Sequence, residues 1–535
     1  MEKLHLLGDE AIAQGAIDGG ISGIYAYPGT PSTEILEYVQ HSKEAAKRNI
    51  HATWSANEKT AMEAALGMSY TGKRAMVCMK HVGLNVAADA FVNSAITGAN
   101  GGLVVVVADD PSMHSSQNEQ DSRFYGQFAL TPIFEPSNQQ EAYYMSYEGF
   151  DFSEKFGVPV LLRLTTRLAH SRSGVVRYEM KNQNEVKIPS NPTQFVLLPS
   201  IARKQYKTLL NKQNEFEEES ENSKFNIYFD GQDNSLGIIA CGIAFNYLLE
   251  NFQGKCPYPV LKISQYPIPR KKIEKIINET QKILVLEDGY PIVENLLKGF
   301  LGKNLNITGR LDGTVPRDGE LNPNIVAKAI GRPINTYFQV PDVVAGRPPS
   351  LCSGCPHIDS FNVLNEALKN YSKGRVFSDI GCYTLAALPP FNSVNSCVDM
   401  GASITMAKGA ADAGLVPAIA VIGDSTFSHS GITGLLDCVN ENSNVKVLIL
   451  DNDTTGMTGG QDSPASGKIE NICKGIGVDP EHVRIINPLK KFDDVNLKIY
   501  LEEFEYNGVS VIIPQRECIQ TIGKNIKTKQ TEVKK

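Results

Sequence analysis

The sequence lacks the features that would place it in a membrane, on nucleic acid or outside the cell. Its apolar run at 103–108 (LVVVVA) is far shorter than the roughly 20 residues of a membrane-spanning helix and is typical of a buried strand. The net charge of −7 offers no basic surface to nucleic acid. No apolar signal region stands at the start (MEKLHLLGDEAIAQG), so the ten cysteines indicate reduced thiols or metal ligands. We therefore expect a cytoplasmic protein without a membrane or nucleic-acid partner.

The chain is too long for one hydrophobic core. Its 535 residues, 42% hydrophobic and 21% charged, are typical of a globular protein with several domains. Helical and strand patterns alternate through most of it. We predict three doubly wound α/β domains, at 1–180, 231–340 and 350–520. A polar linker at 181–230, expected to hold one exposed helix, and a basic tail at 521–535 complete the division.

Two oxygen-bearing side chains follow neighbouring predicted strands. The runs 417–422 (PAIAVI) and 445–450 (VKVLIL) are typical of buried strands, and 431–439 has the apolar spacing of a helix. Such a βαβ unit places the carboxyl ends of both strands at one edge of a sheet. Asp424 and Asn452 follow these ends, so both are expected to reach one Mg²⁺, which takes few protein oxygens together with phosphate oxygens. An isolated Gly-Asp pair would be an ordinary strand end, but the paired spacing predicts a diphosphate site.

This spacing resembles the thiamine diphosphate motif, in which a Gly-Asp-x opening is followed by an asparagine. The resemblance implies that Asp424, the Asn452 side chain and the backbone carbonyl of Thr454 bind the metal ion. Gly423 and Ser425 would then lie at the cofactor. Two more glycines, in the strings SDIGC and MGAS, are assigned to cofactor binding in the same way: Gly381 and Gly401.

Thiamine diphosphate enzymes also need a glutamate from a second domain. In that family a carboxyl group hydrogen-bonded to the pyrimidine N1′ drives the cofactor into its reactive imino form, which requires a poorly solvated site. The segment 58–67 (EKTAMEAALG), followed by Gly72, resembles the family's small-residue helix, so Glu58 is the predicted catalytic carboxylate. Glu63 competes with it but matches no motif position. Taken alone, Glu58 would be an ordinary surface carboxylate.

Two loops directly after predicted strands are expected at the same edge of the first sheet. The loop 27–32 (YPGTPS) resembles the Tyr-Pro-x-Thr-Pro-Ser loop of the 2-oxoacid:ferredoxin oxidoreductases, whose threonine touches the substrate carboxylate. Thr30 takes that role by resemblance. In 79–85 (MKHVGLN), Lys80 and His81 are candidates for binding the substrate carboxylate or carrying protons. For His81, packing or capping is an equally good interpretation.

Four of the cysteines form a possible metal site. Cys352 and Cys355 make a CxxC turn, Cys382 follows in DIGC, and Cys518 comes after the last predicted strand. By itself the CxxC pair is consistent with zinc, a redox dithiol or chance. In the 2-oxoacid:ferredoxin oxidoreductases, cysteines at matching positions hold a [4Fe–4S] cluster, which the resemblance implies here. Zinc remains the alternative.

The resemblance extends over most of the chain. The strings GDEAIAQGAIDGG, YPGTPSTEI, MKHVGLNVAAD, DGTVPRDGELNP, CSGCPH, SDIGCYTLAALPP, MGAS and TGMTGGQ are similar to the alpha subunit of indolepyruvate ferredoxin oxidoreductase. The resemblance implies oxidative decarboxylation of arylpyruvates to acyl-coenzyme A, electron transfer to ferredoxin, and a beta-subunit partner in a dimer of heterodimers. The middle domain would be transketolase-C-terminal-like. That subunit usually continues into a ferredoxin-like module, which this sequence does not contain.

Two other functions are consistent with parts of the pattern. A thiamine diphosphate-dependent arylpyruvate decarboxylase would release an aldehyde and would need neither iron nor coenzyme A, which leaves the four cysteines unexplained. A non-catalytic subunit with a vestigial cofactor site is disfavoured, because Asp424, Asn452 and Glu58 are all present. Motifs alone do not distinguish among aryl 2-oxoacids, since that choice depends on the shape of the substrate pocket.

Overall fold

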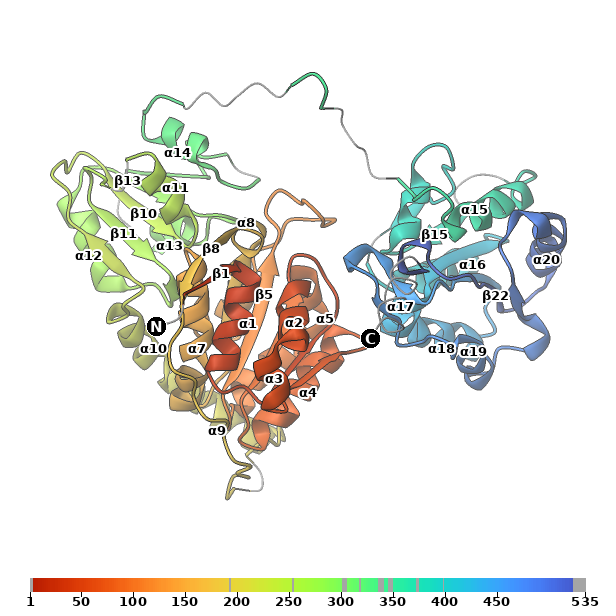
Figure 1. The fold of residues 1–535 in the computed structure, drawn as a ribbon, viewed down its shortest axis with the longest axis horizontal. Helices are drawn as coiled ribbons and strands as arrows, with labels where there is room; N and C mark the ends of the chain where they lie inside the picture. The colour runs from red at the N-terminus through yellow and green to blue at the C-terminus, as the bar shows by residue number, and fades with distance from the viewer. Residues whose placement is uncertain are drawn as a thin grey trace, which may run out of the picture. The chain divides into compact units, whose positions relative to one another are not determined.

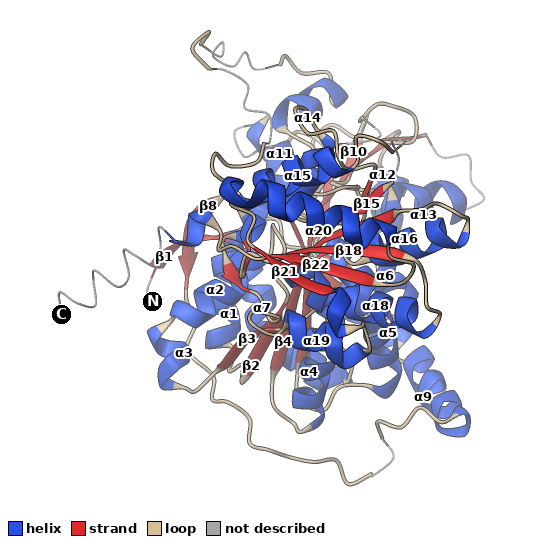
Figure 2. Cartoon of the chain, turned by 90° about the vertical axis from the view of Figure 1, so that its right-hand side faces the viewer, coloured by secondary structure: helices blue, strands red, loops and turns tan. Residues whose placement is uncertain are grey.

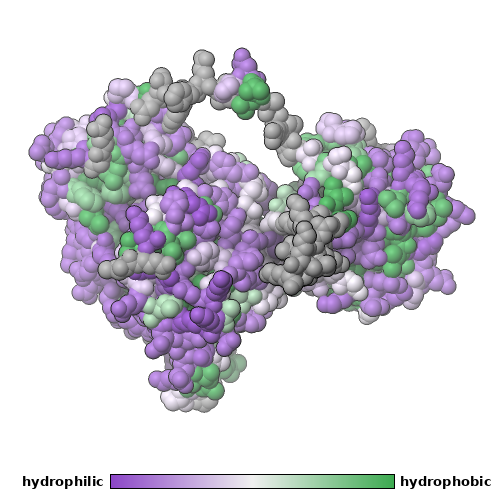
Figure 3. All heavy atoms as spheres, viewed as in Figure 1, coloured by the Kyte–Doolittle hydropathy of each residue, from purple (hydrophilic) through white to green (hydrophobic). Residues whose placement is uncertain are grey.

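The computed structural model describes residues 3–191, 194–252, 255–300, 306–316, 319–334, 341–344, 350–371, 375–397 and 399–522. The chain forms two compact units, Met1–Phe338 and Gln339–Lys535, and each is described by itself (Figure 1). No helix within the described ranges has the length and apolar character needed to cross a lipid bilayer. Hydrophilic residues cover most of the face seen in Figure 3. Apart from its first two residues, the predicted tail at 521–535 lies outside the described part of the chain.

The first sheet of the N-terminal unit has seven strands, parallel except at one edge. In spatial order they are β12 (Gln265–Tyr266), β6 (Ile133–Phe134), β7 (Val160–Thr165), β5 (Leu103–Asp109), β4 (Ala75–Lys80), β2 (Gly23–Ala26) and β3 (His51–Trp54). Only β12 is antiparallel to its neighbour. Every residue of β5 is buried. This agrees with its apolar sequence, which is typical of a parallel strand covered by helices on both faces.

Helices cover both faces of this sheet. One face packs against α1 (Gly8–Asp18), α2 (Thr33–His41) and α7 (Gln139–Phe156). The other packs against α4 (Glu58–Tyr70) and α5 (His81–Thr97). The remaining elements are α3 (Lys43–Lys47), α6 (Arg123–Phe128), α8 (Thr166–Ala169) and the antiparallel pair of β1 (Lys3–Leu7) and β8 (Arg172–Val176).

A second sheet belongs to the same unit. Its spatial order is β14 (Ile307–Thr308), β13 (Ile283–Leu286), β10 (Gly237–Cys241), β11 (Val260–Ile263) and β9 (Ile227–Phe229), with only β9 antiparallel. Its helices are α11 (Ala244–Glu250), α12 (Arg270–Glu279), α13 (Ile292–Phe300) and α14 (Pro323–Ala329). Directly after β11 the chain enters β12, the edge strand of the first sheet. The two sheets are therefore joined through the backbone as well as through side chains.

The segment predicted as a linker at 181–230 has more structure than expected. It contains two helices, α9 (Pro199–Asn211) and α10 (Gln213–Glu221), and ends in β9. Leu209 and Phe216 are buried, and the Phe216 ring packs edge-on against Phe156 at 5.3 Å between centroids. Each of the two helices thus buries an apolar side chain within a charged sequence. The expectation of one exposed helix was wrong, because the segment forms two helices and each is anchored by such a side chain.

The C-terminal unit holds one parallel sheet of six strands. In spatial order they are β16 (Ser396–Cys397), β15 (Val376–Ser378), β17 (Ala418–Gly423), β18 (Val445–Leu450), β22 (Ser510–Pro514) and β21 (Val483–Ile486). The pairing of β17 with β18 across α18 (Ile432–Asn440) confirms the predicted βαβ unit. Short strands β19 (Thr454–Thr455) and β20 (Gln461–Asp462) form a separate antiparallel pair.

Helices cover both faces of this sheet too. On one face lie α16 (Ala402–Asp412), α18 and α19 (Ile469–Ile476), and on the other α15 (Pro356–Ala367) and α20 (Asp493–Glu505). Figure 2 shows α15 and α20 on the opposite side of the strands from α18 and α19. The central strands β17, β18 and β22 are thus buried along their whole length. The structure confirms an α/β protein built on mostly parallel sheets.

Buried ion pairs hold the two sheets of the N-terminal unit together. Arg163 on β7 pairs with Asp109 at 2.6 Å and with Glu135 at 2.5 Å. Arg123 pairs with Glu287, which follows β13 of the second sheet, at 3.1 Å. Both guanidinium groups are fully buried. Each buried charge has a partner of opposite sign, which offsets the loss of hydration. Removing one partner would leave the other charge buried and uncompensated and would destabilise the fold.

We expect Arg163→Met to destabilise the N-terminal unit by about 3–5 kcal/mol, because it leaves the Asp109 and Glu135 carboxylates buried without this cation. Arg270→Met is the matched control, since Arg270 pairs with Glu217 on the surface and should matter by about 1 kcal/mol or less. Urea unfolding measures both. Equal midpoints for the two variants would show that the network is not stabilising.

Candidate functional site

Asp424 lies where β17 ends and is almost completely buried. Its Oδ1 accepts a hydrogen bond from the Ser425 N–H at 2.8 Å. Its Oδ2 is buried with no hydrogen-bond partner among the described residues. Burial raises the pKa of Asp424 to about 7, and the charges of Asp451 and Asp453 raise it further. An unpartnered carboxylate beside two other acids is a place where a divalent cation would be stabilised.

Asn452 follows β18 at the same edge, because Gly423 and Leu450 are paired in register. Its Oδ1 accepts from the Thr454 N–H at 3.3 Å, and its Nδ2 lies 3.3 Å from Nε2 of His357. Thr454 is buried, and its hydroxyl donates to the Gln461 carbonyl at 3.0 Å. The structure therefore brings the predicted metal ligands to adjacent strand ends.

The predicted cofactor glycines permit close packing around Tyr383. A Cβ at Gly381 would lie 2.2 Å from the Tyr383 ring, and one at Gly423 would lie 2.7 Å from the same ring. Gly401 has a φ of +93°, and its Cβ would lie 2.5 Å from Cβ of Ser430. Any side chain at these positions would push the strand-end loops apart. The glycines therefore allow these loops to approach each other closely.

Four cysteines lie together at this edge. Cys355 directly precedes α15, and its N–H donates to the Cys352 carbonyl at 3.0 Å. Burial raises the pKa of Cys382 to about 12, and negative charge on Cys355, Cys518 and Cys352 adds to the rise. The Cys518 N–H donates to the Asn452 carbonyl at 3.1 Å. Residues from three separate stretches thus form one thiol group that adjoins the predicted metal ligands.

Other cysteines of the unit are placed differently. Cys438 on α18 and Cys473 on α19 are buried in the hydrophobic core. Cys397 is directed to the Asp379 carbonyl at 3.6 Å. The thiol group is therefore a selected set and not a general accumulation of cysteine.

Two buried polar residues of this edge were missed in the sequence. His357 is buried, and burial lowers its pKa to about 4. Burial raises the pKa of Asp379 to about 7, although Ser403 donates to it at 2.5 Å and Tyr383 also donates to it. The signal for each was present, since His357 follows the CxxC turn and Asp379 directly follows β15.

In the N-terminal unit, Glu58 is the first residue of α4 and is buried. A Cβ at Gly83 would lie 2.5 Å from Glu58 Oε1, so the carboxylate packs against the first turn of α5. The competing Glu63 is exposed on the surface beside Lys59. Of the two candidates for the catalytic carboxylate, only Glu58 therefore lies in a poorly solvated environment.

Lys80 and His81 lie at the same edge as Glu58. The stem of Lys80 passes 3.3 Å from a Cβ built on Gly29, and its Nζ donates to the Ser115 carbonyl at 3.3 Å. Burial lowers the pKa of Lys80, while the charges of Asp110 and Glu58 act in the opposite direction. His81 is buried, with Nε2 at 3.3 Å from the Asn118 carbonyl and no hydrogen-bond partner at Nδ1 within the described ranges.

The loop that carries Thr30 lies next to Lys80, because both contact Ser115. Within it, the Gly29 N–H donates to the Thr33 hydroxyl at 3.1 Å, and Ser32 donates to the Gly29 carbonyl at 2.8 Å. The Ser115 hydroxyl donates to the Thr30 carbonyl at 3.3 Å. Ser115 thus contacts both Lys80 and Thr30, which holds the two predicted substrate residues beside each other.

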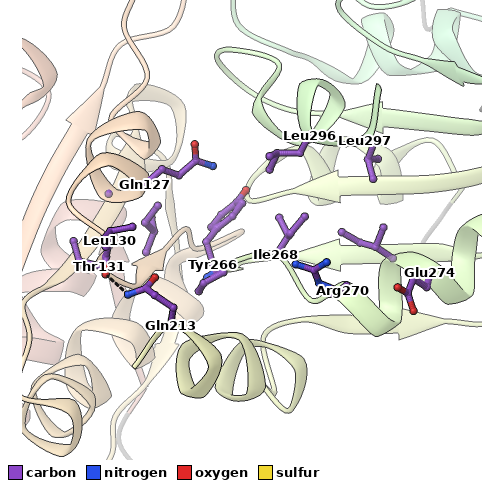
Figure 4. A pocket seen from close by; sticks show the side chains of 14 residues that line it. Gln127, Leu130, Thr131, Gln213, Tyr266, Ile268, Arg270, Glu274, Leu296 and Leu297 are labelled. Carbon is purple, nitrogen blue, oxygen red and sulfur yellow. Dashed lines mark hydrogen bonds between the residues drawn. The ribbon is translucent and has the colours of Figure 1, made fainter. Parts of the chain in front are cut away.

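A separate pocket of ≈ 290 Å³ lies in the N-terminal unit, between the first and second sheets. Figure 4 shows Tyr266 on one side of it and Leu296 and Leu297 on another, with Gln213 hydrogen-bonded to the Leu130 carbonyl at 3.1 Å. The lining is mainly apolar and includes none of the predicted site residues. It is therefore distinct from the groups around Glu58 and Asp424.

Comparison with known proteins shows where this chain belongs. Residues 14–224 match the family described as pyruvate flavodoxin/ferredoxin oxidoreductase, thiamine diphosphate-binding, and residues 379–531 match the thiamine pyrophosphate enzyme C-terminal binding domain. Indolepyruvate oxidoreductase subunit IorA of Archaeoglobus fulgidus is 41% identical over 549 residues, covering 97% of this chain and 86% of that protein. The chain belongs to the indolepyruvate oxidoreductase IorA family. The resemblance found in the sequence is confirmed, and Glu58 and Asp424 each fall within a matched thiamine diphosphate domain.

Other members and one solved structure agree with this placement. The IorA subunit of Pyrococcus abyssi is 38% identical over 563 residues, with 97% of this chain and 86% of that protein covered. A 2-oxoglutarate:ferredoxin oxidoreductase from Magnetococcus marinus has a similar fold, with a TM-score of 0.52 and 16% identity over 62% of this chain and 65% of that chain. Over that part, the fold of this chain is similar to the fold of that enzyme.

Asp424 should make the stability of the metal-free protein depend on pH. Its pKa is about 7 in the folded chain and about 3.9 when unfolded, so folding takes up a proton between these values and stability falls as pH rises through that window. We expect Asp424→Asn to flatten this dependence. Urea unfolding of metal-free protein at several pH values from 4 to 8 measures it, with the exposed Asp437→Asn as control. An unchanged pH dependence in Asp424→Asn would show that this carboxyl is not the source.

Proposed function

We propose that this chain is the catalytic alpha subunit of an enzyme that oxidatively decarboxylates arylpyruvates to aryl-acyl-coenzyme A and passes electrons singly to ferredoxin. The observation that carries this proposal is the hydrogen bond from the Cys518 N–H to the Asn452 carbonyl. It joins the thiol group directly to a predicted ligand of the cofactor's metal ion. A decarboxylase without electron transfer would have no use for four converging cysteines in that place.

The C-terminal unit would hold the diphosphate end of the cofactor. Asp424 Oδ2, the Asn452 side chain and the Thr454 backbone carbonyl would hold Mg²⁺, and Gly423 and Ser425 would face the diphosphate. Gly381 and Gly401 keep the surrounding loops close enough for this. The buried, unpartnered oxygen of Asp424 supports the assignment, because a cation would remove the cost of burying its charge.

Glu58 would act on the pyrimidine end. A carboxyl group with little access to water keeps a hydrogen bond to a ring nitrogen strong, which supports its role in activating the cofactor. Thr30 and Lys80 would bind the substrate carboxylate, and His81 would carry a proton through its unpartnered Nδ1. When bound, thiamine diphosphate supplies the electron sink for loss of CO₂.

Cys352, Cys355, Cys382 and Cys518 would hold one [4Fe–4S] cluster, which supplies one-electron steps. The charges of the neighbouring thiols raise the pKa of Cys355 and of Cys382, which supports a single multi-thiolate site. A beta subunit, ferredoxin and coenzyme A are the proposed partners, with a dimer of heterodimers as the assembly. The relatives' name, which describes a subunit, supports a partner chain.

Glu58→Gln should keep cofactor binding and lower turnover by roughly 10²-fold or more, because the amide cannot share the proton that activates the pyrimidine. Glu63→Gln is the matched control, since Glu63 is exposed. Steady-state turnover with indolepyruvate, in the presence of the beta subunit, and calorimetric binding of thiamine diphosphate measure the two effects. Full activity of Glu58→Gln would remove Glu58 from the mechanism.

Iron and acid-labile sulfide should reach about four of each per chain in protein prepared without oxygen. Cys382→Ala should lose this iron and retain thiamine diphosphate, whereas Cys397→Ala, its neighbour in sequence, should retain both. Zinc in place of iron would mean that the thiols are structural. Absence of iron together with aldehyde as the product would establish the simple decarboxylase instead.

A further inference from the structure

Three side chains of the N-terminal unit form a cluster that the proposed function does not use. Asp9 lies in the first turn of α1, Glu34 in the first turn of α2, and His170 directly after α8. One ligand atom from each lies within 4.8 Å of those from the other two. His170 Nε2 is 3.7 Å from Glu34 Oε1. Three helices thus direct two carboxylates and an imidazole to one point.

The Asp9 carboxylate has no partner although it is completely buried. Its exposed fraction is 0%, and neither Oδ1 nor Oδ2 has a hydrogen-bond partner among the described residues. Glu34 Oε2 is buried and unpartnered as well. The nearby Arg172 does not relieve this, because it pairs with Glu10 at 2.9 Å. A buried carboxylate without partners costs several kcal/mol, so a proton or a cation is required.

The fold holds this carboxylate in place tightly. A Cβ at Gly8 would lie 2.3 Å from the Leu168 carbonyl, so the start of α1 is pressed against the segment that leads to His170. In the absence of a cation, burial raises the pKa of Asp9 well above its usual range, and the charge of Glu34 adds to the rise. The Asp9 carboxyl would then keep its proton.

The donor set suits a metal ion of intermediate hardness. Carboxylate oxygen and imidazole nitrogen bind Zn²⁺ at about 2.0–2.2 Å, so two donors of one ion lie at most about 4.4 Å apart. His170 Nε2 and Glu34 Oε1, 3.7 Å apart, are already within that limit, and the two side chains have exposed fractions of 37% and 39%. Their open side leaves room for a water ligand. We propose that Asp9, Glu34 and His170 bind one divalent transition-metal ion of the Zn²⁺ class.

Such an ion would join three helices beside the predicted substrate loop. Glu34 follows Thr30 by four residues, and α2 begins where that loop ends. A metal ion at Asp9 would fix the start of α2 against α1 and the end of α8. The site is structural in this proposal and belongs to the N-terminal unit alone, whereas the four cysteines and Asp424 belong to the C-terminal unit.

The test is a titration of the full-length chain, with its iron–sulfur and Mg²⁺–thiamine diphosphate sites filled, by Co²⁺ and separately by Zn²⁺. One additional equivalent should remain after gel filtration. The Co²⁺ form should show ligand-field bands without thiolate charge-transfer absorption, which separates this site from the cysteines. Asp9→Asn, which keeps the shape and removes the charge, and His170→Ala should each weaken binding at least tenfold.

Matched controls come from the same neighbourhood. Glu10→Gln removes the adjacent acid of α1, and His114→Ala removes another half-exposed histidine that pairs with Glu320. Both should keep the additional equivalent. Should Asp9→Asn fail to fold, His170→Ala at the half-exposed position still decides the outcome. Equal metal retention in wild type, Asp9→Asn and His170→Ala, or no retention in wild type, would overturn the proposal and leave Asp9 as a protonated buried carboxyl.

Discussion

Neighbouring parallel strands end at the same edge of their sheet, and the candidate site depends on this constraint. In the C-terminal unit the strands β15, β17, β18 and β22 are consecutive in space, although other elements separate them in the chain. The residues that follow them are Asp379, Asp424, Asn452 and Cys518. Strand order alone therefore assembles acids, an amide and a thiol that lie up to 140 residues apart into one edge. The hydrogen bond from the Cys518 N–H to the Asn452 carbonyl holds the segment after β22 against the segment after β18.

Unpartnered buried carboxylates are the clearest functional signal of this molecule. Burial raises the pKa of Asp424 to about 7, and it also raises the pKa of Asp109, where Arg163 at 2.6 Å acts in the opposite direction. The presence or absence of a cationic partner distinguishes acids that stabilise the fold from acids that are candidates for binding a ligand. The acids that hold the two sheets of the N-terminal unit together pair with arginine, whereas no arginine or lysine of the described residues pairs with Asp424 or Asp9. A fold tolerates such groups when a proton or a ligand neutralises them.

Close packing limits which residues this edge accepts. The ring of Tyr383 occupies the space that a side chain at Gly381 or Gly423 would need, and its hydroxyl donates to Asp379. Gly83 does the same for Glu58, whose carboxylate fills the space of a missing Cβ. In both units, a glycine thus allows a buried side chain of the candidate site to pack closely against the backbone. The site residues are therefore positioned by small neighbours as much as by their own hydrogen bonds.

Sequence alone determined the elements and the candidate chemistry. Apolar runs and strand-end residues were enough to predict the βαβ unit and to place Asp424 and Asn452 at one edge, because these follow from local periodicity and from the geometry of parallel sheets. The choice of four cysteines came instead from the resemblance to a known family. Tertiary structure decided what depends on burial. It separated Glu58 from Glu63, showed that two apolar side chains anchor the segment expected to be a linker, and placed His357 beside Asn452. It also brought Asp9, Glu34 and His170 together from helices with no shared motif. Desolvation depends on all the atoms packed around a group, and these cannot be predicted from a local pattern in the sequence.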